Sequence, residues 1–222
     1  MTMFSSSGTD DLPLDVLWED GERIFCRIGR VDGRGERRDL IAVRSAAEGP
    51  ASATIARLVH EYELRDYLDG AWAARPLELM KERGQVVLVL ETKGSGPLDR
   101  LPVPAKDLGQ FLRLAVSLSE ALGRLHERGL IHKDIKPGNI LASAATDRIW
   151  LTGFGIASRV PREKQSPDPP ELISGTLAYM APEQTRRMNR TIDSRSDLYA
   201  LGVTFYQMLT SAPPFTASDP ME

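Results

Sequence analysis

The chain has 222 residues, 41% of them hydrophobic, with 28 basic and 31 acidic side chains and a formal net charge of −3. That length and apolar content suffice for one folded domain with its own core. The charge gives no overall attraction to nucleic acid or anionic lipid, so neither is expected as a partner. A single cysteine, Cys26, excludes an intramolecular disulfide and fits a reducing cytoplasm. No apolar run is long enough for direct membrane insertion.

The first part of the chain predicts a small, mostly antiparallel sheet around one helix. Residues 1–16 are rich in Ser, Gly and Asp and are expected to form a disordered lead-in. Apolar and β-branched runs predict strands over 23–28, 39–44 and 85–90. Apolar residues at helical spacing predict a helix over 52–68, which would pack on the sheet.

The second part has a different, mainly helical pattern. Residues 92–97, Thr-Lys-Gly-Ser-Gly-Pro, break every regular pattern and predict a hinge. An apolar stripe from Leu108 to Leu125 predicts a helix that ends at Arg128-Gly129. A second helix is expected over 197–209, after a polar loop at 131–139, short strands near 140 and 150, and a long irregular segment from about 157 to 178.

The polar loop carries the most specific chemical signal. Its residues 132–139 read His-Lys-Asp-Ile-Lys-Pro-Gly-Asn, which resembles the H-R-D-x-K-P-x-N catalytic loop of eukaryotic-like protein kinases. The resemblance implies that Asp134 accepts the proton of a substrate hydroxyl, that Lys136 holds the transferring phosphoryl group, and that Asn139 is the ligand of Mg²⁺.

Other landmarks follow in the order of that family. Gly-Phe-Gly stands at 153–155 in the place of D-F-G, Ala-Pro-Glu stands at 181–183, and Asp-Leu-Tyr-Ala-Leu-Gly stands at 197–202. The resemblance covers roughly residues 18–222. It implies an α+β, bilobal fold with a small antiparallel β lobe over 17–91, the hinge at 92–97 and a partial helical lobe over 98–222. Because the sequence stops before the last helices of the family's second lobe, we expect the fold to be C-terminally truncated.

Two features of the resemblance concern the substrate and the wider protein. The lysine two residues after Asp134 and the stretch Gly-Thr-Leu-Ala-Tyr-Met at 175–180 look like the Ser/Thr branch of protein kinases. Residues 151–209 look like the N-terminal kinase domain of large bacterial proteins that continue into an ATPase region and a sensor histidine kinase. The expected partners are therefore a protein substrate or downstream domains of the same polypeptide.

The nucleotide site departs from the family pattern at two positions. Gly153 replaces the aspartate that coordinates Mg²⁺, and glycine has no side-chain ligand. Ile-Ala-Val-Arg at 41–44 aligns with V-A-I-K, so Arg44 is expected to reach the phosphates of ATP. Glu61, or failing that Glu63, would be its partner on the helix.

A glycine-rich phosphate loop with the family's spacing is missing. Gly29 and Gly33 lie in the expected region and are assigned to the nucleotide site, with a plain hairpin turn as the alternative. Glu91, next to the hinge, is assigned to the same site.

Two functions follow from these residues. The first is a Ser/Thr protein kinase domain, of weakened activity, that transfers the γ-phosphoryl group of ATP to protein hydroxyls. The alternative is a pseudokinase that serves as a regulatory or interaction module of a signalling protein. Ser174 and Thr176 are candidate phosphorylation sites, but Thr176 could instead support the catalytic loop.

Overall fold

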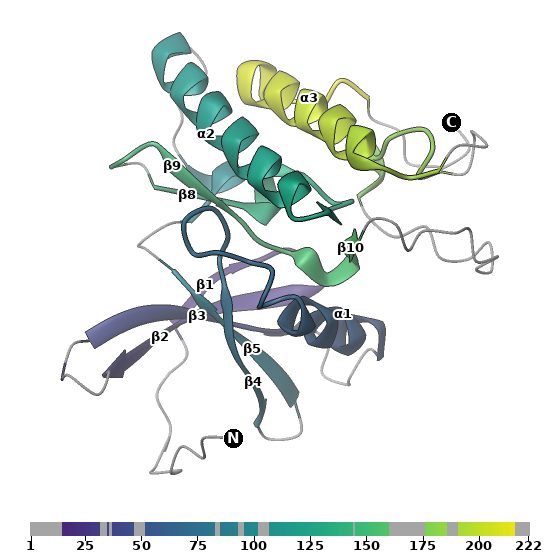
Figure 1. Ribbon diagram of the computed structural model, residues 1–222. Helices are drawn as coiled ribbons and strands as arrows, with labels where there is room; N and C mark the ends of the chain where they lie inside the picture. The colour runs from purple at the N-terminus through teal and green to yellow at the C-terminus, as the bar shows by residue number, and fades with distance from the viewer. Residues whose placement is uncertain are drawn as a thin grey trace.

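The structure is a computed structural model that describes residues 15–31, 35, 37–46, 52–82, 85–92, 96–101, 107–143, 145–159, 176–185 and 191–215. It has two lobes stacked on one another, a β lobe that contains the first helix and a helical lobe (Figure 1). The predicted α+β, bilobal architecture is confirmed.

The β lobe is a five-stranded antiparallel sheet with the order β1-β2-β3-β5-β4. All three predicted strands are present and somewhat longer than predicted. Two strands, β1 and β4, were not predicted. The strands are β1 (Asp15–Glu19), β2 (Arg23–Val31), β3 (Arg37–Ser45), β4 (Pro76–Glu82) and β5 (Gln85–Glu91).

The two faces of the sheet carry different side chains because successive residues of a strand point to opposite sides. We call the side that packs on Leu58 of α1 (Ser52–Glu63) the inner face. Its buried residues include Phe25, Ile41, Val43, Leu88 and Leu90. The outer face has a separate small cluster of Ile24, Cys26, Ala42 and Val87. Any strand residue can therefore be assigned to one face by its register.

The first helix is shorter than predicted. It ends at Glu63, and residues 64–67 continue as turns in which Tyr67 N–H donates to the carbonyl of Leu64. Leu64 and Leu68, whose spacing suggested a longer helix, are buried in the core of the helical lobe. The apolar spacing thus continues beyond the helix because these side chains pack against the second lobe.

The helical lobe contains both predicted helices and both predicted short strands. The buried face of α2 follows the predicted stripe at Leu118, Leu122 and Leu125, whereas Leu108 and Leu112 at its start are exposed. Asp107 and Asp193 cap the two helices by accepting from the N–H of Gln110 and Arg195. The elements are α2 (Leu108–Glu127), α3 (Ser194–Thr210), β6 (Gly96–Pro97), β7 (Leu130–Ile131), β8 (Ile140–Ser143), β9 (Arg148–Leu151) and β10 (Ser158–Arg159).

The two lobes are joined by backbone and apolar contacts. The amide of Ala74 donates to the carbonyl of Leu151 (2.8 Å), and the amide of Leu151 donates to the carbonyl of Trp72 (2.9 Å). Trp150 from the helical lobe is buried in the same cluster as Trp18 and Phe25 of the sheet. The predicted hinge at 92–97 ends inside β6, which pairs with β8 of the helical lobe.

Residues 15 and 16, which were predicted to belong to the lead-in, are part of strand β1. Strand β1 starts at Asp15, whereas residues 1–14 lie outside the described residues. Only five residues long, β1 follows a stretch rich in Ser and Asp, and it lacked the length that identified the other strands. Because β1 is the first strand, the turn between the first two strands lies at 20–22 and not after residue 28.

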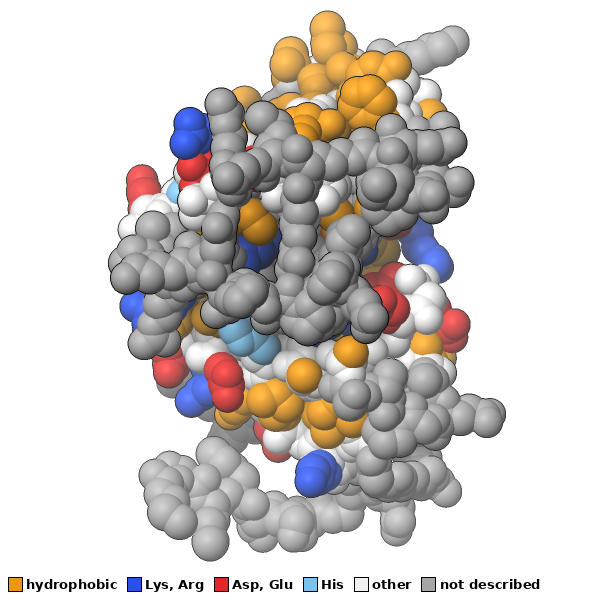
Figure 2. Space-filling model, turned by 90° about the vertical axis from the view of Figure 1, so that its right-hand side faces the viewer, with side chains coloured by type: hydrophobic (Ala, Val, Ile, Leu, Met, Phe, Trp, Pro, Cys, Tyr) orange, Lys and Arg blue, Asp and Glu red, His pale blue; other side chains and the backbone are white. Residues whose placement is uncertain are grey.

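Apolar side chains are exposed at the end of the helical lobe that lies away from the β lobe (Figure 2). Within the described residues, no helix has the length and apolar character needed to cross a membrane. The exposed apolar residues of this lobe include Leu112, Val116, Leu198, Tyr206 and Phe215.

Replacing Leu58 by alanine should lower the free energy of unfolding by about 2–5 kcal/mol, because this side chain is 1% exposed and links α1 to the inner face. The same change at Leu112, a helical leucine that is 52% exposed, should alter it by about 0.5 kcal/mol or less. Urea denaturation followed by circular dichroism measures both. Equal losses would mean that α1 does not pack as described.

Candidate active site

The loop at 132–136 is held in place by one buried carboxylate. Asp197 of α3 is fully buried and accepts from the backbone N–H of His132 (2.8 Å) and of Lys133 (2.8 Å). Its Oδ2 also contacts the Nε2 of His126 (2.8 Å). Lys133 has a φ of 69°, a left-handed conformation that is uncommon outside glycine. The backbone of the loop is therefore fixed to α3 by Asp197, independently of the contacts of its functional side chains.

Asp134, Lys136 and Asn139 are brought together as the sequence predicted. The Asn139 Nδ2 donates to Asp134 Oδ2 (2.7 Å) and to the backbone carbonyl of Asp134 (2.8 Å). Lys136 Nζ lies 3.3 Å from the same Oδ2. The Asp134 carboxylate is thus held by an amide and an ammonium group, in an arrangement that can accept a proton from a nearby hydroxyl.

Thr176 completes this cluster from the segment before Ala-Pro-Glu. Its backbone N–H donates to Asp134 Oδ1 (3.0 Å), and its hydroxyl accepts from Lys136 Nζ (2.6 Å). These contacts favour a supporting role for Thr176 in the catalytic loop. Ser174 lies outside the described residues.

Glu61 of α1 lies in the same region, deeply buried, with 2% of its surface exposed. Its Oε1 accepts from the backbone N–H of Gly153 (3.0 Å). Burial raises the pKa of Glu61, although the charge of Arg23 and the amides of Phe154 and Gly153 favour its ionised form. Glu61 thereby connects α1 of the β lobe to the segment that begins at Gly153.

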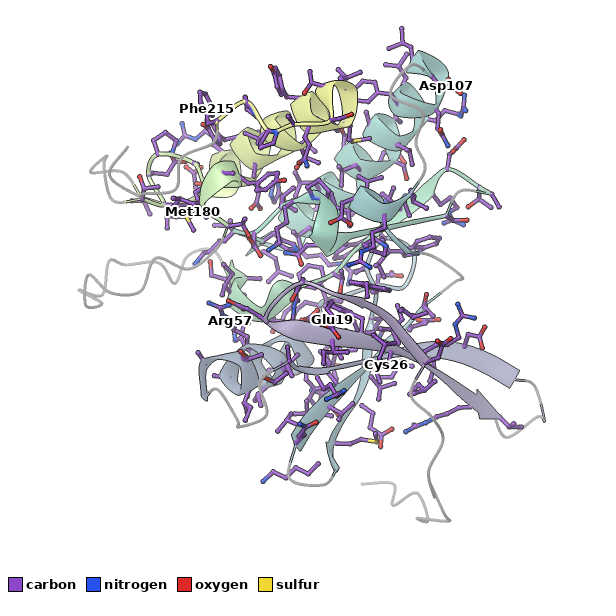
Figure 3. The ribbon with its side chains drawn as sticks, turned by 180° about the vertical axis from the view of Figure 1, so that it is seen from behind. Glu19, Cys26, Arg57, Asp107, Met180 and Phe215 are labelled. Carbon is purple, nitrogen blue, oxygen red and sulfur yellow. The ribbon has the colours of Figure 1, made fainter. Side chains whose placement is uncertain are left out.

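Position 153 has no room for a side chain. Gly153 has a φ of 79°, and a Cβ atom there would lie 2.5 Å from Asn139 Oδ1. A Cβ at Gly155 would lie 2.7 Å from the Cβ of Arg57, which Figure 3 shows on α1 at the boundary between the lobes. Helix α1 therefore packs directly on this glycine-containing segment, and Asn139 fills the space next to Gly153.

The structure contradicts the predicted pairing of Arg44 with Glu61. In the register, Arg44 lies opposite Ile24 and Val87, which belong to the outer face. Its Nη1 is 3.4 Å from Gln85 Oε1. Arg44 is also next to Cys26: burial raises the pKa of the Cys26 thiol, and a hydrogen bond from Arg44 opposes that effect. Figure 3 shows Cys26 within this sheet. The motif alignment placed Arg44 correctly in a strand but on the wrong face, because a shift of one residue reverses the side.

Contrary to the sequence prediction, Gly29 does not lie in a loop between the first two strands. Gly29 lies inside β2, paired with Asp39, and about 20 Å of strand separates it from Arg23 at the start of β2. Gly33 lies outside the described residues, so its assignment stays a prediction. The turn between the first two strands is instead formed by Asp20, Gly21 and Glu22.

Glu91 is not brought to the cluster around Asp134. It ends β5 opposite Leu40, on the outer-face register, and its N–H donates to the carbonyl of Arg75 (2.9 Å). Its carboxylate lies against Gly70, where an added Cβ would be 2.8 Å from Oε2. The side chain of Glu91 is therefore directed to the turn after α1.

Arg23, which the motif analysis missed, occupies the centre of the site. It is the first residue of β2, on the inner-face register with Phe25, and its side chain is 14% exposed. Its Nη2 donates to Asn139 Oδ1 (2.8 Å). Although burial disfavours its charge, the carboxylates of Asp20, Glu61 and Asp134 raise the pKa of Arg23. The sequence feature that could have identified Arg23 is Asp-Gly at 20–21. This pair predicts a hairpin turn, and the position of the turn determines to which face of the sheet each β2 side chain points.

The β1–β2 turn is closed by its own acidic side chain. Asp20 Oδ1 accepts from the N–H of Glu22 (3.1 Å) and of Arg23 (2.8 Å), while Oδ2 accepts from Arg23 Nε (2.8 Å) and Nη2 (2.5 Å). Burial raises the pKa of Asp20, but Arg23 and these amides outweigh it and hold the pKa below its ordinary value of 3.8. Two amides that could face a phosphate are thus bound to Asp20.

These residues do not fit Mg²⁺ as they are arranged. The Asn139 oxygen expected to bind the ion faces the cationic Arg23, and Gly153 offers no side-chain ligand. The described residues also contain no group of three or more acidic, His or Cys side chains suited to a metal ion.

Gly153→Ala should destabilise the protein more than Gly21→Ala. Both glycines have a left-handed φ, and alanine costs about 1–2 kcal/mol there. Space is open at Gly21, whereas at Gly153 the methyl group must displace Asn139 and weaken its hydrogen bonds, which adds about 1–3 kcal/mol. Thermal or urea unfolding measures the difference, and equal losses would show that Asn139 does not fill this space.

The sequence is similar to those of known protein kinases. The family model for the protein kinase domain matches residues 34–222. A serine/threonine-protein kinase PknB of Mycobacterium tuberculosis is 40% identical over 102 residues, which are 46% of this chain and 16% of the relative. A serine/threonine-protein kinase PknF of the same species is 38% identical over 132 residues, 55% of this chain and 25% of the relative.

A probable serine/threonine-protein kinase PknB of Bifidobacterium longum is 35% identical over 145 residues, 57% of this chain and 21% of the relative. The chain thus aligns with a quarter or less of the length of these curated relatives. Since the family model matches well over half of its residues, the chain belongs to the protein kinase domain family.

Proposed function

We propose that the chain is a Ser/Thr protein kinase domain that transfers the γ-phosphoryl group of ATP to a hydroxyl group of a protein. The observation that carries this proposal is the Asp134 carboxylate, held by Asn139, Lys136 and Thr176 in one hydrogen-bonded cluster. Protein kinase domains in general use ATP with a divalent metal ion. The printed names of the relatives, which are Ser/Thr kinases, support the same class.

In the reaction, the substrate hydroxyl oxygen forms a bond to the γ-phosphorus and the bond from that phosphorus to the β,γ-bridging oxygen breaks. ADP leaves, and the hydroxyl proton passes to the Asp134 carboxylate. Lys136, which lies between Asp134 and Thr176, supplies positive charge to the transferring group. The backbone N–H of Thr176 fixes the orientation of the carboxylate.

The rate is expected to be low. The described residues do not fit Mg²⁺ in this arrangement, so the charge of the transferring group is balanced by Lys136 alone among the residues of the cluster around Asp134. The loss of one preorganised electrostatic group in an active site costs about 10²- to 10³-fold in rate, and Gly153 stands where the family has such a group. The substrate class is a protein hydroxyl, and downstream domains of the same polypeptide are further candidate partners.

A second candidate is a pseudokinase that binds a partner or nucleotide without transfer. It is favoured by the contact between Arg23 and Asn139, which puts a cation at the expected metal ligand, and by the crowded space at Gly153. Under this alternative the cluster around Asp134 has a structural role only.

Asp134→Asn should reduce phosphoryl transfer to background, because the amide cannot accept the proton at neutral pH. The measurement is transfer of labelled phosphate from ATP to a generic Ser/Thr protein substrate with Mg²⁺ or Mn²⁺ present. Asp66→Asn is the matched control, since the Asp66 side chain is 71% exposed and its ion pair is with Arg65, which is not part of the cluster. Undetectable transfer by the folded wild type, or full activity of Asp134→Asn, would favour the second candidate.

A further inference from the structure

We propose that Arg23, at the start of β2, is the residue that binds the phosphates of the nucleotide. This inference deepens the proposed function and rests on the nucleotide binding that it requires. It replaces Arg44, which the sequence motif indicated, by an arginine on the neighbouring strand and the opposite face.

The place of Arg23 in the fold is determined by the strand register. Arg23 and Phe25 alternate with Ile24 and Cys26, so Arg23 is directed to the inner face, where α1 and the helical lobe meet the sheet. Its guanidinium reaches Asn139, two residues past the Lys-Pro of the catalytic loop, at 2.8 Å. A cation in this position lies next to the expected phosphoryl-transfer groups, whereas Arg44 faces Gln85 on the far side of the sheet.

The chemistry of Arg23 suits a phosphate. A guanidinium group presents several N–H donors in a planar fork that matches carboxylates and phosphates. In this structure the Arg23 guanidinium binds a carboxylate oxygen, Asp20 Oδ2, which accepts hydrogen bonds from both Nε and Nη2. A phosphate oxygen can take the place of this carboxylate and make the same two hydrogen bonds.

Of the three carboxylates near Arg23, Asp20 is the one that a phosphate would have to displace. Lys136 is the cation that lies against Asp134, and burial raises the pKa of Glu61. Asp20, on the exposed β1–β2 turn, is the acidic group that binds Arg23 directly. Binding of a phosphate therefore competes mainly with Asp20 for the guanidinium.

The test is the affinity for ATP of the wild type, Arg23→Gln, Arg44→Gln and Arg27→Gln, measured by calorimetric titration in EDTA and again with Mg²⁺. Loss of a charge-assisted pair should weaken ATP binding by Arg23→Gln about tenfold to a hundredfold. Arg27, an exposed arginine of the same strand, and Arg44 should each change it by about threefold or less. Arg23→Lys should recover part of the affinity, because it keeps the charge without the fork.

A second variant covers the case in which Arg23→Gln does not fold. Asp20→Asn keeps a side-chain oxygen that can accept from the turn amides, but it removes the negative charge that competes with phosphate. ATP should bind this variant about threefold to tenfold more tightly than the wild type. Unchanged or weaker binding by folded Asp20→Asn would overturn the inference.

The outcomes separate this inference from the proposed function. If ATP binding depends on Arg23 but no phosphate is transferred, the inference stands and the kinase activity fails. If phosphate is transferred and ATP binding depends on Arg44 but not on Arg23, the inference fails and the kinase activity stands. A folded wild type that binds no ATP in either buffer overturns both.

Discussion

The alternation of side chains along β2 is the constraint on which the candidate site depends. It places Arg23 on the inner face with Phe25 and leaves Cys26 on the outer face. From that position the guanidinium bridges Asp20 of the β lobe and Asn139 of the helical lobe. Asn139 in turn holds Asp134. A shift of one residue in this strand would remove the contact between the lobes at their functional centre.

Much of the fold and half of the site could be predicted from the sequence. The loop residues Asp134, Lys136 and Asn139 were found because they lie within one short motif. Such a motif can be recognised without knowledge of the fold. Arg44 was misplaced, because its role depended on the face of a strand, which a motif does not specify. Arg23 was missed since its face follows from the Asp-Gly turn and from β1, which was too short to recognise.

The structure accounts for the departures from the family pattern as a connected set. Gly153 leaves space that the Asn139 side chain fills, and Asn139 can then accept from Arg23. The turn that holds Arg23 uses its amides for Asp20 and not for an external anion. Asn139 matches the family motif, whereas Gly153, Arg23 and Asp20 give the site of this chain its particular contacts.

Exchange of Asp20 for a phosphate changes the hydrogen-bond partner of the Arg23 guanidinium, which NMR spectroscopy can observe directly. In an NMR spectrum of the ¹⁵N-labelled protein, the Nε–H signal of Arg23 is assigned by its loss in Arg23→Lys. We predict that ATP in EDTA shifts this signal and leaves that of Arg27 unchanged. An Arg23 signal that stays fixed while ATP saturates the protein would contradict the account.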